Sequence, residues 1–120
     1  MDVFADLRGP HGLQVWDGIV GRVVEGDNVT FSVIELDPGA VASMHSHPQE
    51  QLGVVIEGAL RFTIGGETRD LGPGEAWRIP GDTPHEAVAG PDGALLVEVF
   101  SPRREDWGGL ARIERSGRLG

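Results

Sequence analysis

The sequence predicts an all-β fold, an antiparallel barrel or jelly roll of about nine or ten short strands. Three observations lead to this prediction. Short apolar runs rich in β-branched residues recur along the chain. The 19 glycines and 8 prolines fall mostly between these runs, as turns, and no helical pattern separates one run from the next. The 120 residues predict one domain, 1–120, large enough to bury a core without disulfides.

Three strands are expected before the first pair of histidines. Residues 19–24 are mostly apolar, and residues 29–36 form a second segment in which apolar residues alternate in part. Such alternation is typical of a strand with one buried face. After a turn at 37–39, a short strand through Val41 leads to the histidines.

Six strands are expected in the second half, each bounded by a turn that contains glycine or proline. They cover residues 52–57, 59–64, 67–71, 76–79, 85–89 and 94–100. Gly58 is expected to form the turn between the first two, and Gly65-Gly66 a hairpin turn. The C-terminal tail, 103–120, contains the only candidate for a short helix, over 103–115, which a Gly-Gly pair weakens.

The charge of the chain restricts its partners. The formal net charge is −9, from 19 acidic and 10 basic residues, which argues against nucleic acids and anionic membranes. An anionic substrate remains compatible, because a bound cation and a few arginines reverse the local sign. No stretch approaches the roughly 20 apolar residues of a membrane span. Residues 1–10 lack the apolar core of a signal peptide, so we expect a cytoplasmic protein.

A group of metal-ligand residue types lies in the middle of the chain. His45 and His47 point to the same side of an extended segment, because alternate residues of a strand share a face. Gln51 opens the next strand, and His85 starts a later one. The chain has no cysteine, so any metal must take nitrogen and oxygen ligands. Three imidazoles and one amide oxygen suit one divalent Mn, Fe, Co, Ni or Zn ion.

A second group of polar residues closes the last predicted strand. Glu98 and Phe100 share a strand face, and Glu98 lies in the otherwise apolar run 94–100. A carboxylate there either faces a polar cavity, where it can serve proton transfer, or points outward into solvent. In the second case Leu96 and Val99 would serve the core instead.

Two arginines, Arg103 and Arg104, follow this strand. One of them could fold back and pair with a substrate carboxylate through two guanidinium nitrogens. The alternative is an ordinary pair of surface arginines.

The histidine spacing resembles the two sequence motifs of the cupin family. The first motif matches 39–58: Gly39, five residues, His45-x-His47, three residues, Gln51, six residues, Gly58. The second matches 72–85, with Gly72-Pro-Gly-Glu, Ile79-Pro-Gly and Thr83-Pro-His85. The resemblance implies a double-stranded β-helix barrel in which His45, His47, Gln51 and His85 hold the metal.

One ligand position departs from the usual cupin pattern. The first motif normally carries glutamate where Gln51 stands, and Glu50 competes for that position. The offset to Gly58 selects Gln51, and residues 50 and 51 face opposite sides of a strand. A neutral amide in place of a carboxylate makes the metal a stronger Lewis acid. His11 lies outside both motifs and is expected in a surface loop.

A closer resemblance is to the pectin-degradation cupins, which convert unsaturated uronate monosaccharides into linear keto forms. It rests on His-x-His-Pro-x-x-Gln at 45–51, Gln-Leu-Gly-Val-Val-Ile-Glu-Gly at 51–58 and Phe-Ser-Pro-x-Arg-Glu-Asp at 100–106. The resemblance implies that Glu98, Phe100 and Arg104 line the site. The family carries aspartate where Glu98 stands, so the carboxylate here reaches one methylene further.

The resemblance implies a non-redox reaction on a sugar acid. The metal would act as a Lewis acid, Arg104 would pair with the substrate carboxylate, and Glu98 would carry a proton during ring opening or ketonisation. Phe100, with Trp77, would form an apolar wall against the sugar, although Trp77 and Trp107 also suit plain packing. Two alternatives stay open: an iron or nickel dioxygenase, and a binding module without turnover. Small cupins often dimerise through edge strands, so we expect a homodimer.

Overall fold

The computed structural model describes residues 3–120. These residues form nine strands and one short 3-10 helix, η1, and no α-helix lies among them. The elements are β1 (His11–Trp16), β2 (Ile19–Glu25), β3 (Thr30–Leu36), β4 (Val41–His45), β5 (Glu50–Ile64), β6 (Glu67–Leu71), β7 (Ala76–Ile79), β8 (His85–Ser101), η1 (Glu105–Gly109) and β9 (Arg112–Glu114). The strands join in one antiparallel sheet, so the predicted all-β fold is confirmed.

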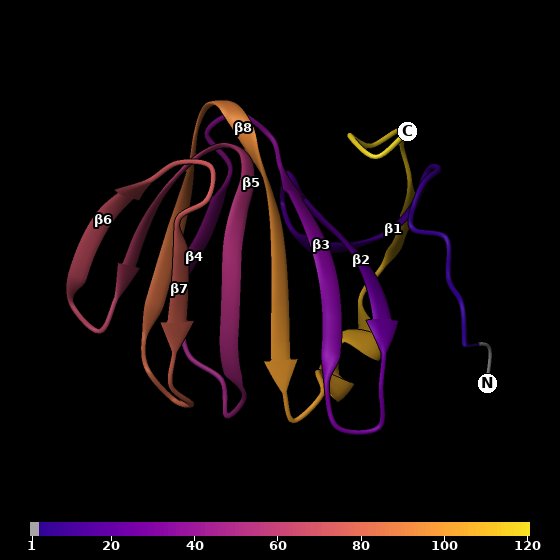
Figure 1. Ribbon diagram of the computed structural model, residues 1–120, viewed down its shortest axis with the longest axis horizontal. Helices are drawn as coiled ribbons and strands as arrows, with labels where there is room; N and C mark the ends of the chain where they lie inside the picture. Colours follow the sequence, from indigo (N-terminus) through magenta and orange to yellow (C-terminus); the bar gives the residue numbers. More distant parts are fainter. Residues whose placement is uncertain (1–2) are drawn as a thin grey trace.

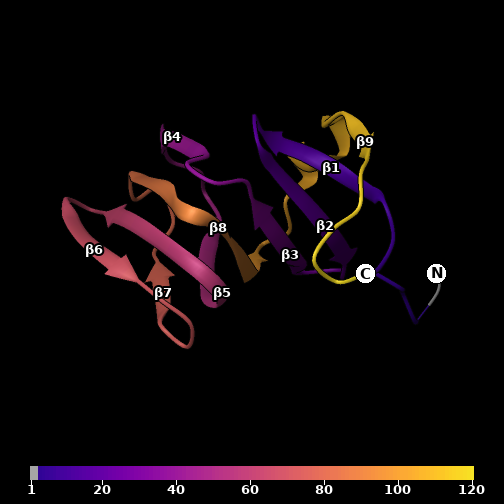
Figure 2. The same cartoon turned by 90° about the horizontal axis from the view of Figure 1, so that it is seen from above.

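The two longest strands, β5 and β8, organise the sheet. They pair with each other over most of their lengths. The second half of β8 also pairs with β3, and its first half pairs with β4. Figure 1 shows β7, β5, β8, β3 and β2 side by side, and Figure 2 shows β4 and β1 on the opposite side of the curled sheet. The interior of this curl holds the candidate site.

Two predicted strand breaks are wrong. Residues 52–57 and 59–64 are parts of one strand, β5, and the predicted turn at Gly58 is a bulge. Gly58 has φ +80°, and the register with β8 shifts on both sides of it. A Cβ there would collide with the carbonyl of Gly93, so glycine lets the two long strands approach closely. Likewise, residues 85–89 and 94–100 both belong to β8.

The chain ends form two strands that local patterns did not predict. β1 pairs with β2 on one side and with the three-residue β9 on the other. The helix expected over 103–115 is reduced to the single 3-10 turn of η1 followed by β9. Glycines at the end of η1 favour this early stop. His11 is exposed, as expected, but it begins β1 and does not lie in a loop.

The core consists of inward-facing residues on alternate positions of the strands. Its buried apolar side chains come from β2, β3, β5, β6, β7, β8 and η1: Ile19, Ile34, Leu36, Val55, Leu60, Phe62, Leu71, Trp77, Ile79, Ala87, Ala89, Ala94, Leu96, Phe100 and Trp107. Gly53 faces inward without a side chain, and its Cβ position is filled by the ring of Trp77. The small residue therefore lets the indole reach deep into the barrel.

No helix among residues 3–120 is long and apolar enough to cross a membrane.

Candidate metal centre

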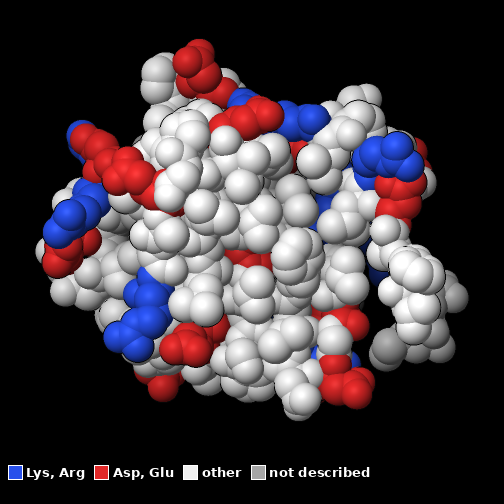
Figure 3. Space-filling view, in the orientation of Figure 1, with Lys and Arg blue, Asp and Glu red and all other residues white. Residues whose placement is uncertain are grey.

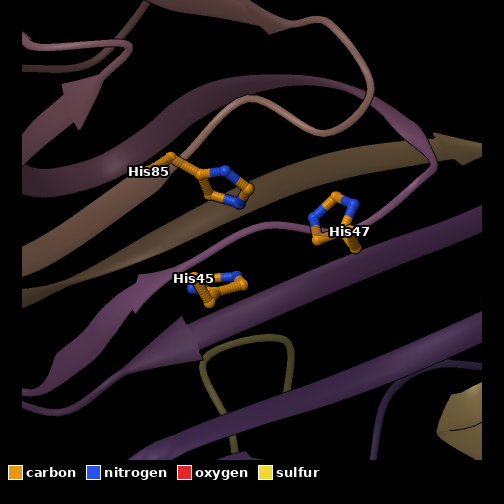
Figure 4. A group of neighbouring side chains, drawn as sticks. All are labelled: His45, His47 and His85. Atoms are coloured by element: carbon orange, nitrogen blue, oxygen red, sulfur yellow. The ribbon is translucent and has the colours of Figure 1, made fainter.

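Three histidines converge at one end of the barrel interior. His45 ends β4 and lies opposite His85, which begins β8, while His47 follows β4 directly. One ring nitrogen from each residue lies within 4.8 Å of those of the other two. The ring centroids are 4.3 to 5.7 Å apart, and Figure 4 shows the three imidazoles around a common space. The antiparallel pairing of β4 with β8 thus joins residues far apart in sequence.

Backbone hydrogen bonds set the tautomer of each imidazole. In every case Nδ1 lies at hydrogen-bond distance from a carbonyl oxygen two residues away in the chain. The accepting oxygens belong to Ser43 for His45 (2.6 Å), Gln49 for His47 (3.1 Å) and Thr83 for His85 (2.7 Å). A carbonyl only accepts, so each Nδ1 carries the hydrogen and each Nε2 presents a lone pair. This is the usual preparation of histidine for a metal ion.

The Nε2 lone pairs of His47 and His85 have no hydrogen-bond donor opposite them among the described residues, and a bound cation would satisfy them. Nε2 of His85 is buried and has no hydrogen-bond partner among the described residues. Nε2 of His47 lies 3.0 Å from Oε1 of Gln51, so two acceptors face each other. Burial lowers the pKa of His85 to about 4. Burial, followed by the charge of Arg104, also lowers the pKa of His47, so both rings are neutral at pH 7. These residues therefore fit a divalent transition metal.

Gln51 reaches the cluster from the N-terminal end of β5. Its side chain is only 5% exposed, whereas the neighbouring Glu50 is exposed on the other face. Its Nε2 donates a hydrogen bond to Oε2 of Glu98, and the indole Nε1 of Trp77 donates to the same oxygen at 3.3 Å. Gln51 is therefore the amide that faces the histidines.

Glu98 faces the interior and lies beside this cluster. It is 7% exposed, on the part of β8 that pairs with β3 and β5. Burial raises the pKa of Glu98 to about 7, although hydrogen bonds from Gln51 and Trp77 act in the opposite direction. The alternative of an outward, solvated Glu98 is therefore wrong.

A cavity of about 250 Å³ adjoins the cluster. Its polar lining consists of His45, Gln51, His85, Glu98, Arg104 and Asp106. The remaining wall is apolar and comes mainly from β1, β3, β8 and the η1 region. Phe100 lies in this wall, with its ring centroid 5.7 Å from that of His47. A few converging polar groups in an apolar cavity are typical of a small-molecule site.

Arg104, and not Arg103, borders the cavity. Its guanidinium lies 5.0 Å from the ring centroid of Phe100 and 4.8 Å from that of Trp107. Nε and Nη2 donate to the two carboxylate oxygens of Asp106, at 3.1 and 3.0 Å. These hydrogen bonds from Arg104 lower the pKa of Asp106. Arg103 is exposed and pairs with Glu105.

Two residues of this site, Trp16 and Asp106, had no role predicted from the sequence, and one predicted role changes. Trp16 lines the cavity with its ring centroid 5.2 Å from that of His45, but β1 was not predicted as a strand. Asp106 was not predicted as the partner of Arg104. Trp107 does line the cavity. Trp77 does not line the described cavity wall, and its indole Nε1 instead donates a hydrogen bond to Glu98.

Comparisons with known proteins agree with this geometry. Residues 32–100 match the model of the cupin domain family. The pectin degradation protein KdgF of Dickeya dadantii is 28% identical over 96 residues, which cover 78% of this chain and 87% of that protein. The solved structure of KdgF from a Halomonas species has a TM-score of 0.72 and 37% identity, covering 77% of this chain and 86% of that one.

A third relative is named as a decarboxylase. Oxalate decarboxylase OxdC of Bacillus subtilis is 32% identical over 79 residues, or 62% of this chain but only 20% of that longer protein. The relatives thus include proteins named as enzymes, and the three-histidine cluster suits a transition metal. The family match covers more than half of the chain, and the fold is the jelly roll that the two motifs implied. The chain belongs to the cupin family and is a small cupin similar to KdgF.

Proposed function

We propose that this cupin binds one divalent transition metal and catalyses the non-redox ring opening or ketonisation of an unsaturated uronate. The observation that carries the proposal is that a buried carboxylate, Glu98, and a stacked arginine, Arg104, share one cavity with two histidines of the three-histidine cluster. Similarity to KdgF, a pectin degradation protein, supports a sugar acid as the substrate. His45, His47, Gln51 and His85 would hold the metal.

The metal, when bound, would supply Lewis acidity toward a substrate oxygen. Arg104 would orient the substrate through its carboxylate. Two of its nitrogens are held by Asp106, and within residues 3–120 no acceptor engages Nη1. The rings of Phe100 and Trp107 hold the guanidinium plane, so Nη1 is pre-positioned for a substrate carboxylate.

Glu98 would transfer the proton. Its Oε2 is held by Gln51 and Trp77, whereas Oε1 accepts no hydrogen bond from the described part of the chain. Oε1 is therefore the atom that would exchange a proton with the substrate. The apolar wall that includes Phe100 would exclude water from the reacting carbons.

The proposal is tested directly with metal-loaded protein and an unsaturated galacturonate or guluronate monosaccharide. We expect the ultraviolet absorbance of the conjugated double bond to fall faster than without enzyme. An unchanged rate would contradict the proposal for this substrate class. Oxygen uptake by the iron-loaded protein would instead indicate a dioxygenase.

Arg104→Lys should lower kcat/KM in this assay by roughly 100-fold. Lysine has no planar group to stack on Phe100 and Trp107, and it lacks the two fixed donors that pair with Asp106. Asp106→Asn should have a smaller effect in the same direction, since asparagine keeps one acceptor oxygen for Arg104 and the two rings still hold the guanidinium. The matched control is Arg103→Lys, an exposed neighbour that should keep the wild-type rate. Equal effects at 103 and 104 would contradict the assigned role of Arg104.

We further propose that a second copy of the chain covers one face of the sheet. Figure 3 shows charged residues around the edge of the face formed by β7, β5, β8, β3 and β2, with a largely uncharged middle. Apolar side chains in register across it include Phe31, Val99 and Leu52, and Leu52 and Ile56 are 45% and 46% exposed. An antiparallel sheet with one solvated face would carry polar residues there.

The size of this face suits a homodimer. It lies in the plane of the two longest dimensions of the molecule, which are 39 and 30 Å, and a face in this plane can accommodate the roughly 800 Å² per partner of a standard interface. Because the middle of this face is uncharged, two copies of an acidic chain can meet there without placing like charges in contact.

Leu52→Glu should convert a wild-type dimer into a monomer, because it buries a charge in the middle of this interface. Light scattering after size-exclusion chromatography measures the mass directly. Thr68→Glu, at an exposed position of β6 and outside the five strands of this face, should leave the dimer intact. A wild-type protein that elutes as a monomer at all concentrations would rule the interface out.

A further inference from the structure

We propose that Glu98 has a second role as a positioning residue, which fixes the side-chain amide of Gln51 so that Oε1 faces the metal. This inference rests on the metal site of the proposed function. It concerns the orientation of a ligand and is separate from proton transfer, which would use the other oxygen of the same carboxylate.

An amide ligand has an ambiguity that a carboxylate or an imidazole fixed at Nδ1 lacks. One end of the Gln51 side chain accepts and can bind a cation, whereas the other end only donates and cannot. The two ends exchange places by a half-turn about the last side-chain bond. A site that uses glutamine therefore needs a second group that recognises the donor end.

Glu98 is placed to be that group. Its Oε2 accepts from Nε2 of Gln51, and the indole of Trp77 donates to the same oxygen and holds it in place. With Nε2 committed to Glu98, Oε1 of Gln51 is turned to His47, 3.0 Å from its Nε2. The absence of a side chain at Gly53 makes room for the Trp77 ring in this arrangement.

Burial makes the orientation matter energetically. Gln51 and Glu98 are 5% and 7% exposed, so solvent cannot readily replace a lost partner. Without an acceptor at position 98, turning Oε1 to the metal would leave Nε2 buried and unpaired. An unpaired buried donor raises the free energy of the state that contains it, and here that state is only the metal-bound one. The loss should therefore be measured as weaker metal binding.

Calorimetric titration of the full chain with Ni²⁺ tests the inference without any substrate. Glu98→Leu, which removes the acceptor, should weaken Ni²⁺ binding by about 10- to 100-fold, as for other groups that orient metal ligands. Glu98→Ala gives a second route to the same loss if the leucine variant does not fold. Glu98→Gln keeps an acceptor oxygen without the charge, and its affinity should stay within about threefold of wild type.

A double-mutant cycle shows whether Glu98 acts through Gln51. In a Gln51→Ala background there is no amide to orient, so Glu98→Leu should have no further effect on Ni²⁺ affinity. An effect of equal size in both backgrounds would overturn the inference, because Glu98 would then act through its charge. Equal losses for Glu98→Gln and Glu98→Leu would overturn it for the same reason. A wild-type protein that binds no Ni²⁺ would instead refute the metal site itself.

Discussion

Saturation with Ni²⁺ should raise the Tm of the wild-type protein by about 15 °C, and His85→Ala should abolish this shift. A ligand present at about 1,000 times its Kd stabilises the folded state by about 4 kcal/mol. For a domain of this length, each kcal/mol changes the Tm by about 4 °C. Differential scanning calorimetry with and without Ni²⁺ measures the shift for each variant against its own metal-free baseline.

His85 is the most informative of the three histidines for this test. It is 2% exposed, and its Nε2 is a buried acceptor that has no partner in the described chain. Alanine removes that nitrogen and leaves two histidines of the cluster. His11→Ala, at an exposed site, should keep the full Ni²⁺ shift. A His85→Ala variant that retained the shift would show that the metal binds elsewhere.

Much of the site could be predicted because its residues obey local rules. His45 and His47 are two residues apart in an extended segment, and alternation alone places them together. Glu98 and Phe100 share a face of β8 for the same reason. His85 is far from both pairs in sequence, and only the antiparallel pairing of β4 with β8 brings it close. The family resemblance supplied that step, since strand periodicity says nothing about which strands pair.

The remaining features depend on contacts between distant segments. β1 and β9 are short and pair with each other from opposite ends of the chain, so neither has a strong pattern of its own. Trp16 therefore had no predicted position. At Gly58, a glycine that is typical of a turn permits a bulge in a continuous strand. The two outcomes look alike in sequence, because both need the same backbone conformation.

Two variants of Glu98 separate the effect of its charge from the effect of its side-chain length. Glu98→Gln should lower kcat for the unsaturated uronate by about 10²- to 10⁴-fold, because an amide cannot exchange the proton at Oε1. It should nevertheless keep Ni²⁺ affinity, since its oxygen still accepts from Gln51. Glu50→Gln, an exposed change of the same kind, is the control and should leave kcat unaltered.

Glu98→Asp keeps the carboxylate but withdraws it by about 1 Å, a displacement that can reduce a rate by about 100-fold. The shorter side chain would also stretch the hydrogen bonds from Gln51 and Trp77. We therefore expect Glu98→Asp to weaken Ni²⁺ binding more than Glu98→Gln does, while retaining more of the reaction rate. This crossed order follows only if one oxygen of Glu98 orients the metal ligand and the other carries the proton. The same rank order of the two variants in both measurements would contradict that division.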